Sequence, residues 1–353
     1  MSDRSGAGLV ELAVLQALEA VTAGRPQAHV PSARALAEIE ERIGLGPRYG
    51  YQVLADLARP WMIPVRTVSG LGNFGDRDFP EPSEPPYTKC RPSHAGQLIL
   101  DAEAGRLPPV PVGLINGTTY RGGSQPPLEP FRVLAALRRL LDESRVSDAD
   151  LLRVVGLPYS VTGCDLAGDL DALARGRRTA IRQTGRISIT GVPVPDPAED
   201  RLVPPDNRGW TGWDTPLPPR PVHLMIESLP ARTTINDAAR AIAQRAEPRQ
   251  WHGSHAQLAG RTALPIAEVD DRSIGYEVRI GVQLRPGADP ALVRDQIAAI
   301  YGVSIEEDWA FPAPLASMMR AWVDRYRGED LGASLTRLED AIRRDRRREL
   351  RNR

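Results

Sequence analysis

The chain has 353 residues, of which 41% are hydrophobic and 25% charged, as expected for a globular protein long enough for two ordinary domains. Its 45 basic and 45 acidic residues balance, which excludes a uniformly basic protein, so any face that binds nucleic acid must be local. No stretch approaches the roughly 20 apolar residues that cross a bilayer, so the composition predicts a protein without a membrane partner.

The first part of the chain predicts short helices followed by a strand. Apolar residues recur at helical spacing in the first of them, and Ser32 after Pro31 is a good N-cap for the second. The predicted helices cover residues 9–21, 32–43 and 49–57. A strand-like "MIPVRTVSG" and a glycine turn follow, an order typical of a winged-helix or helix-turn-helix domain. Any small helical lobe is the open alternative.

The middle of the chain predicts a mixed α+β region. Helices are expected at 96–106, 128–142 and 148–154, with a proline-rich strand and turn in "LPPVPVGLINGTTYRGG". Strands follow in "RTAIRQTGRISITG" and "RPVHLMIESLP", separated by a long surface loop over 193–220. A helix at 234–245, strands at 264–270 and 276–284, and a helix at 290–300 complete a βαββα order.

The end of the chain predicts one long polar helix over 318–353 that finishes in "RRDRRRELRNR". Such a run of charges is commonly a solvated helix end, and a phosphate-binding tail is the other interpretation. The two cysteines, Cys90 and Cys164, form no CxxC pair, which argues against a zinc site and against a disulfide framework. A reduced cytosol is the compartment that such cysteine usage indicates.

One segment, "GLGNFGDRDFPEPSEPPYTKCRPS" from Gly70 to Ser93, combines a glycine turn, a proline-rich loop, Tyr87 and the only lysine of the chain, Lys89. A phenol has a pKa near ~10, so a tyrosine is a poor nucleophile unless a neighbour takes or stabilises its charge. From its residue type alone, Tyr87 is either a nucleophile or an ordinary loop tyrosine.

Several motifs, in the right order, resemble those of one family. Gly70, Gly72, Asn73, Phe74 and Gly75 match its Gly-x-Gly-Asn-Phe-Gly turn, and "YTKCR" is similar to its Tyr-Thr-x-x-Arg motif. Further on, "VPVGLINGTT" and "VHLMIESLPARTTINDAARAIAQ" are similar to later segments of the same family. From about residue 9 to its end, the chain thus resembles the A subunit of bacterial type II DNA topoisomerases, DNA gyrase and topoisomerase IV.

This resemblance implies an α+β fold in three parts. Residues 1–127 would form a winged-helix breakage-reunion domain, residues 128–315 a tower domain that supports bent DNA, and residues 316–353 the start of a coiled-coil helix. Tyr87 would be the nucleophile that attacks a DNA phosphate and forms a 5′-phosphotyrosyl link. The implied location is the cytoplasm, at the nucleoid.

The same resemblance implies the partners. They are duplex DNA, a B-type subunit of gyrase or topoisomerase IV, and, as a further candidate, a second copy of the chain. The chain itself is expected to bind no cofactor and to hold no metal ligands, because its sequence contains neither GxxxxGK[ST] nor Glu-Gly-Asp-Ser. Mg²⁺ and ATP would therefore come through the B subunit.

Candidate DNA contacts are basic residues near the tyrosine and near the predicted recognition helix, although each alone can equally be a solvated surface residue. Around the helix they are Arg34, Arg42 and Arg48, and in the tyrosine segment Arg77, Lys89 and Arg91. Of these six, Arg91 has the best support because it falls on a motif position.

The chain departs from the family where the chemistry is most demanding. Pro86 stands where the family has an arginine before the tyrosine, and Lys89 stands where it has an acid. On an extended segment the Lys89 side chain would point the same way as that of Tyr87 and could replace part of the charge of the missing arginine. The alternative interpretation is that Lys89 is an exposed loop residue. The departures leave a second hypothesis open, a catalytically inactive homologue that binds DNA or modulates a resident gyrase subunit. An unrelated helix-turn-helix regulator is the third.

Overall fold

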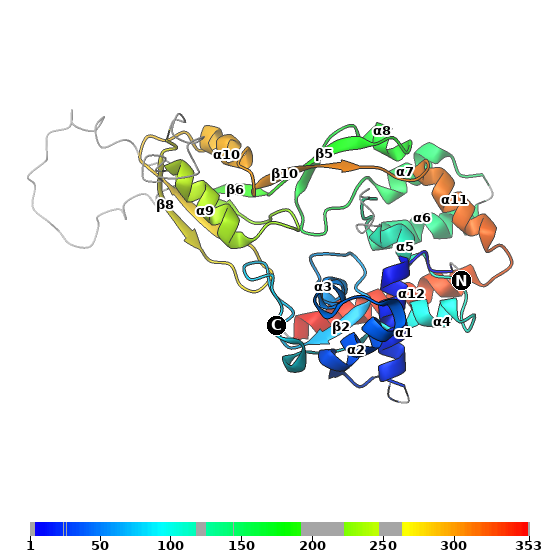
Figure 1. The fold of residues 1–353 in the computed structure, drawn as a ribbon. Helices are drawn as coiled ribbons and strands as arrows, with labels where there is room; N and C mark the ends of the chain where they lie inside the picture. The colour runs from blue at the N-terminus through cyan, green and yellow to red at the C-terminus, as the bar shows by residue number, and fades with distance from the viewer. Residues whose placement is uncertain are drawn as a thin grey trace, which may run out of the picture. The chain divides into compact units, whose positions relative to one another are not determined.

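The computed structural model describes residues 4–23, 25, 27–117, 125–143, 145–191, 222–246 and 263–351. Over these residues the protein has mixed α+β structure, with twelve α-helices and three small sheets (Figure 1). The predicted α+β class is thus confirmed. The predicted loop at 193–220 and the turn residues 118–124 lie outside the described residues.

The chain divides into two compact units. The first comprises Met1–Val161, Leu166–Arg182 and Glu306–Arg353, and the second comprises Thr162–Asp165 and Gln183–Ile305. The three-part division that the family resemblance implies stays a prediction. One sheet, of order β10-β5-β4, is formed by β4 (Asp165–Ala167), β5 (Thr179–Thr184) and β10 (Ser304–Trp309), and the short helix α8 (Leu170–Ala174) follows β4 in the chain.

The first unit begins with three helices, α1 (Leu9–Val21), α2 (Ser32–Ile43) and α3 (Pro47–Ala58), which confirm the three predicted ones. The predicted N-cap is wrong: Pro31 is the N-cap of α2, and the Ser32 hydroxyl bonds to Thr88 instead of the helix backbone. Their apolar stripes are buried in one core, and Gly44 ends α2 in a left-handed conformation that favours glycine. Beside them lies an antiparallel sheet of order β1-β3-β2, formed by β1 (Val30–Pro31), β3 (Lys89–Pro92) and β2 (Val68–Leu71).

The predicted strand after residue 107 is wrong in part, because α5 (Val112–Asn116) is a short helix. Tertiary contacts decide this conformation. Gly113 lies against the backbone of Gly6, whose carbonyl oxygen would be 1.8 Å from an added Cβ. The Asn116 side chain bonds both the N–H and the carbonyl of Val65, each at 2.9 Å, so its amide replaces a strand neighbour.

Three further helices of the first unit follow the prediction closely. They are α4 (His94–Glu103), α6 (Pro130–Asp142) and α7 (Asp148–Val155), all amphipathic with their apolar faces in the same core. The prediction of one long C-terminal helix is wrong, since α11 (Leu315–Arg325) and α12 (Leu331–Arg351) are separate. Gly328 breaks the run at φ 103°, and the buried apolar stripe of α12 then packs on α4 and α6.

The second unit has its own core. Its antiparallel sheet has the order β6-β7-β9-β8, from β6 (Ile187–Thr190), β7 (His223–Ile226), β9 (Ile280–Leu284) and β8 (Ile266–Asp271). The helices α9 (Ile235–Ala246) and α10 (Pro290–Ala298) bury apolar residues against these strands. The strands and helices predicted for this region are confirmed, with ends shifted by a few residues.

Candidate nucleic-acid interface

Tyr87 is the one tyrosine in the sequence from Gly70 to Ser93, the segment that carries the family motifs, and it lies on the surface. It is the last residue of a short 3-10 turn, η1 (Pro85–Tyr87), and 75% of it is exposed. Within the described residues its hydroxyl makes no hydrogen bond. The phenol oxygen is therefore free to reach a ligand on the surface of the first unit.

A buried cluster of three hydroxyls, from Thr88, Tyr51 and Ser32, fixes Thr88, the residue that follows Tyr87. Thr88 is fully buried, and its Oγ1 lies 2.7 Å from the hydroxyl of Tyr51 and 2.8 Å from Ser32 Oγ. The backbone N–H of Ser32 donates to the carbonyl of Thr88 at 2.9 Å. Because Ser32 begins α2 and Tyr51 lies in the first half of α3, this hydroxyl cluster connects the tyrosine turn to both helices.

Tyr51 also anchors the loop before the turn, since its hydroxyl donates to the carbonyl of Ser83 at 2.6 Å. Burial raises the pKa of the Tyr51 phenol, with the hydrogen bond to Thr88 opposing that effect, so the phenol stays protonated and keeps its role as a donor. The sequence did not indicate that Tyr51 and Ser32 belong to the site, because a lone hydroxyl in an amphipathic helix carries no signal of its partner.

Thr88→Val is expected to lower the free energy of unfolding by about 1–2 kcal/mol, because the isosteric side chain leaves two buried hydroxyls short of a partner. Urea unfolding followed by circular dichroism measures this change. Thr190→Val is the control: Thr190 is an exposed strand residue, and its replacement should stay within about 0.5 kcal/mol. Equal stability of both variants would show that the hydroxyl cluster does not stabilise the turn.

The glycines of the turn allow it to lie on the tyrosine segment. Gly72 has φ 94°, and a Cβ there would lie 2.9 Å from the carbonyl oxygen of Tyr87. At Gly75, with φ 90°, the carbonyl oxygen of Pro80 would be 2.5 Å away. The buried Arg59 completes the turn by donating to the carbonyl of Phe74 at 2.9 Å. The motif thus reflects close backbone approach as well as positive φ angles.

The structure places four of the six candidate basic residues on the surface. Arg34 and Arg42 are exposed on α2, Arg48 is exposed at the start of α3, and Lys89 is exposed at the start of β3. The Nε of Arg42 is already 2.5 Å from the Glu38 carboxylate. Since α2 and α3 both bond to Thr88, the tyrosine turn lies beside the helices that carry these arginines.

The expected geometry of Lys89 relative to Tyr87 has no support in the structure. A shared direction of the two side chains requires an extended segment, whereas Tyr87 belongs to a 3-10 turn and the strand begins only at Lys89. The two side chains are therefore not related as alternate residues of one strand. Lys89 pairs across the sheet with Pro31 and Leu71 instead.

The other two candidates, Arg77 and Arg91, are buried, with 3% and 2% of each residue exposed. Arg77 has an interaction partner within the chain. Buried arginines were not expected, because the residue type is mostly found at the surface. Their burial separates them from the four exposed basic residues, and Arg91 lines a cavity beside α4 and α12.

The described residues give no support for a metal site or a membrane span. Among them no group of three or more His, Cys, Asp or Glu side chains is close enough to hold a metal ion. None of the described helices combines the length and the hydropathy of a membrane span. Cys90 and Cys164 are buried and neither takes part in a disulfide, and burial raises the pKa of Cys90 to about 11, so the Cys90 thiol is protonated at neutral pH.

The described residues thus define an α+β protein that presents an exposed tyrosine on a turn held between two helices. No protein-family model matches the chain. It is 23% identical over 273 residues to the chloroplastic/mitochondrial DNA gyrase A subunit of Arabidopsis thaliana, covering 70% of this chain and 25% of the relative. It is 22% identical over 275 residues to a probable chloroplastic/mitochondrial DNA gyrase A subunit of Oryza sativa subsp. japonica, covering 70% of this chain and 26% of that relative.

The matched region is thus about a quarter of the length of these curated relatives. The resemblance that the motifs indicate is confirmed at the level of the family: the chain is distantly similar to the DNA gyrase A subunit.

Proposed function

We propose that this protein is a relative of the type II topoisomerase A subunit that binds duplex DNA and cleaves it transiently through Tyr87. The Tyr87 oxygen would attack a backbone phosphorus, a bond from tyrosine oxygen to phosphorus would form, and the bond from phosphorus to the 3′ oxygen would break. The phenol loses its proton and the leaving 3′ oxygen gains one. The observation that carries this proposal is the 75% exposed Tyr87 on a turn anchored to α2 and α3.

In this proposal the residues of the chain position the tyrosine and the DNA. Thr88, Tyr51 and Ser32 fix the turn, and the exposed Arg34, Arg48 and Lys89 supply cations for backbone phosphates. The helices α1 to α3 with their small sheet would serve as the winged-helix domain. A B-type subunit would bring Mg²⁺, which stabilises the charge of the reacting phosphate, and would hydrolyse ATP.

Covalent trapping tests the proposal. The protein is incubated with end-labelled duplex DNA, Mg²⁺ and a gyrase B subunit, and is then denatured with detergent. We expect a fraction of the labelled DNA to migrate with the protein and to return to free DNA when EDTA is added before the detergent. Absence of any protein-linked DNA, from a protein that shifts the same duplex on a native gel, would contradict cleavage.

That last outcome would favour the second candidate function, a catalytically inactive homologue that binds DNA or a resident gyrase subunit. The observation behind it is Pro86, an exposed residue directly before Tyr87 that offers neither a charge nor an N–H. The transition state gathers negative charge on the phosphate oxygens, and a missing donor for such charge typically costs about 3–4 kcal/mol.

Pro86→Arg separates the two candidates. An arginine beside the tyrosine can donate to the reacting phosphate in the transition state, so we expect the initial rate of adduct formation to rise by about 100-fold over the unmodified protein. Quantified trapping at equal DNA occupancy measures the change. Pro80→Arg adds the same charge at an exposed position of the same loop and should have no such effect. No adduct from Pro86→Arg, with binding intact, would support the inactive homologue.

A further inference from the structure

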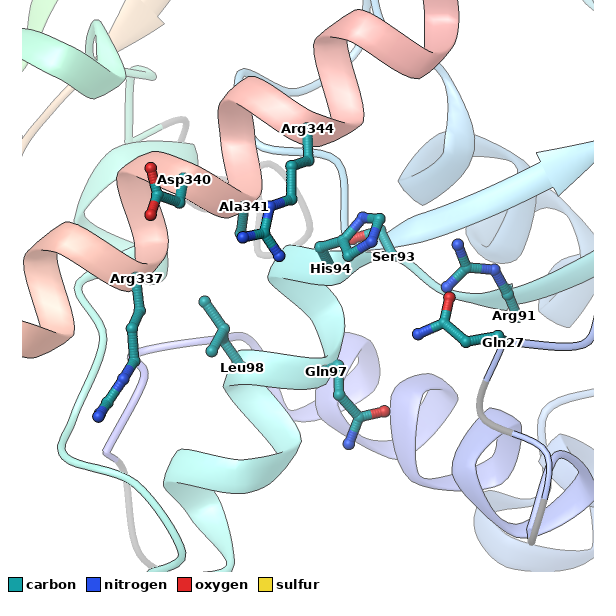
Figure 2. Close-up of a pocket in the computed structure, with 10 residues that line it drawn as sticks. All are labelled: Gln27, Arg91, Ser93, His94, Gln97, Leu98, Arg337, Asp340, Ala341 and Arg344. Atoms are coloured by element: carbon teal, nitrogen blue, oxygen red, sulfur yellow. The ribbon is translucent and has the colours of Figure 1, made fainter.

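A second feature of the first unit is a cavity of about 220 Å³ beside α4 and α12 (Figure 2). Its lining comes from the loop before β1, from the end of β3, from α4 and from α12. The polar residues that line it are Gln27, Arg91, Ser93, His94, Gln97, Arg337, Asp340 and Arg344. Three arginines against a single carboxylate give the lining a positive character at neutral pH.

Arg91 is the unusual member of this lining. Its guanidinium is buried, and its Nη1 donates to the carbonyl of Pro92 at 2.9 Å. In the described part of the chain neither Nε nor Nη2 has a hydrogen-bond partner. A buried guanidinium keeps its charge, so its open donors call for an acceptor, and an anion in the cavity supplies one.

The carboxylate of Asp345 does not meet this need. Asp345 lies close enough to act on the charge of Arg91, but its oxygens accept from His94 Nδ1 at 2.6 Å and from the backbone N–H of Ala95 at 3.2 Å. Its carboxylate therefore caps α4. The N–H of Gly96 donates to Ser93, so the N-terminus of α4 is largely satisfied without a ligand. The cationic charge that faces the cavity comes from side chains.

We propose that this cavity is an anion site that binds one phosphate group through the open donors of Arg91, with Arg344 of α12 and Gln27 and Gln97 at its rim. The fork of Arg91 matches the oxygens of a phosphate, and a volume of about 220 Å³ accommodates one phosphate group with part of its ester. The group can belong to a small phosphate compound or to a DNA strand. This proposal does not depend on cleavage by Tyr87.

His29 does not line the cavity, but the charge of Arg91 affects its pKa. Its Nε2 lies 3.1 Å from Ser69 Oγ, and its pKa is lowered to about 4 by burial first and then by the charges of Arg91, Arg348 and Lys89. A bound phosphate would offset those positive charges. The pKa of His29 is therefore expected to move up toward its ordinary value of 6.5 when the site fills.

The test is a histidine NMR titration of the full chain with inorganic phosphate, repeated with a short blunt duplex. We expect saturable shifts of the His29 and His94 signals with phosphate. Arg91→Met should weaken binding at least tenfold, and Arg344→Gln should weaken it several-fold. Arg347→Gln, an exposed arginine of α12 that does not line the cavity, should leave binding unchanged.

The duplex distinguishes the two sources of phosphate. Shifts caused by the duplex but not by inorganic phosphate, and lost in Arg344→Gln, would assign the site to DNA backbone. Because Arg91 is buried, Arg91→Met can fail to fold, and the exposed Arg344→Gln then carries the test. Binding of either probe that is equal in the unmodified protein and in Arg344→Gln, or no binding at all, would overturn the proposal. Tyr87→Phe should not alter the titration, so failure of cleavage leaves this result independent.

Discussion

Tyr87→Phe is expected to reduce covalent attachment of DNA to the detection limit of the trapping assay. The substitution removes only the phenol oxygen, which is the one atom that the proposed reaction bonds to phosphorus. Since that oxygen has no hydrogen-bond partner within the described residues, its loss should change the free energy of unfolding by less than about 0.5 kcal/mol. Binding of uncleaved duplex, measured by native gel shift, should be retained.

Tyr49→Phe is the matched control for this experiment. Tyr49 is also exposed, at 52%, and lies in the first turn of α3, the helix whose Tyr51 anchors the tyrosine turn. It has no proposed role in bond formation, so its adduct yield should equal that of the unmodified protein. An adduct that persists in Tyr87→Phe would assign the attack to another residue, and the proposal for Tyr87 would be wrong.

Gly96→Ala is expected to destabilise the first unit by about 3 kcal/mol, the upper range for inserting an atom into a packed core. Gly96 is the third residue of α4, where alanine would ordinarily favour the helix. Here an added Cβ would lie 2.1 Å from the carbonyl oxygen of Thr67 and 3.1 Å from Leu15 Cδ2. The same carbonyl accepts from the N–H of Ser93 at 2.9 Å, so it cannot move without breaking that bond.

Gly332→Ala serves as the control with the opposite sign. Gly332 is exposed in the first turn of α12, and the nearest atom to an added Cβ is Asp330 Oδ1 at 3.8 Å. Without a clash, only helix propensity acts, and alanine should stabilise by up to about 1 kcal/mol. Urea unfolding of both variants measures the two effects. A Gly96→Ala protein as stable as Gly332→Ala would mean that α4 does not lie so close to Thr67.

Local patterns predicted most of the secondary structure. The helices α1, α2, α6 and α7 follow from apolar residues at helical spacing with caps such as Ser147, whose side chain accepts from the N–H of Asp150. Where prediction failed, distant contacts or a single glycine decided the conformation. The helix α5 depends on Gly113 packing on Gly6, and the break between α11 and α12 occurs at Gly328. The contact between Gly113 and Gly6 is not visible to a pattern that covers a few neighbouring residues, whereas Gly328 is a local signal for a helix end that the prediction of one long helix did not use.

The candidate site was likewise predicted from the sequence only in part. The sequence by itself determined the family resemblance, the glycine turn and the choice of Tyr87, because these depend on residue types at short spacing. Only the tertiary structure decided that Tyr87 is exposed while Arg91 is buried, although both belong to one motif. It also brought Thr88, Tyr51 and Ser32 together and placed α12 over the cavity that Arg91 lines. Burial and hydrogen-bond partners are set by elements far apart in the chain, so they follow from the packed fold and not from any one segment.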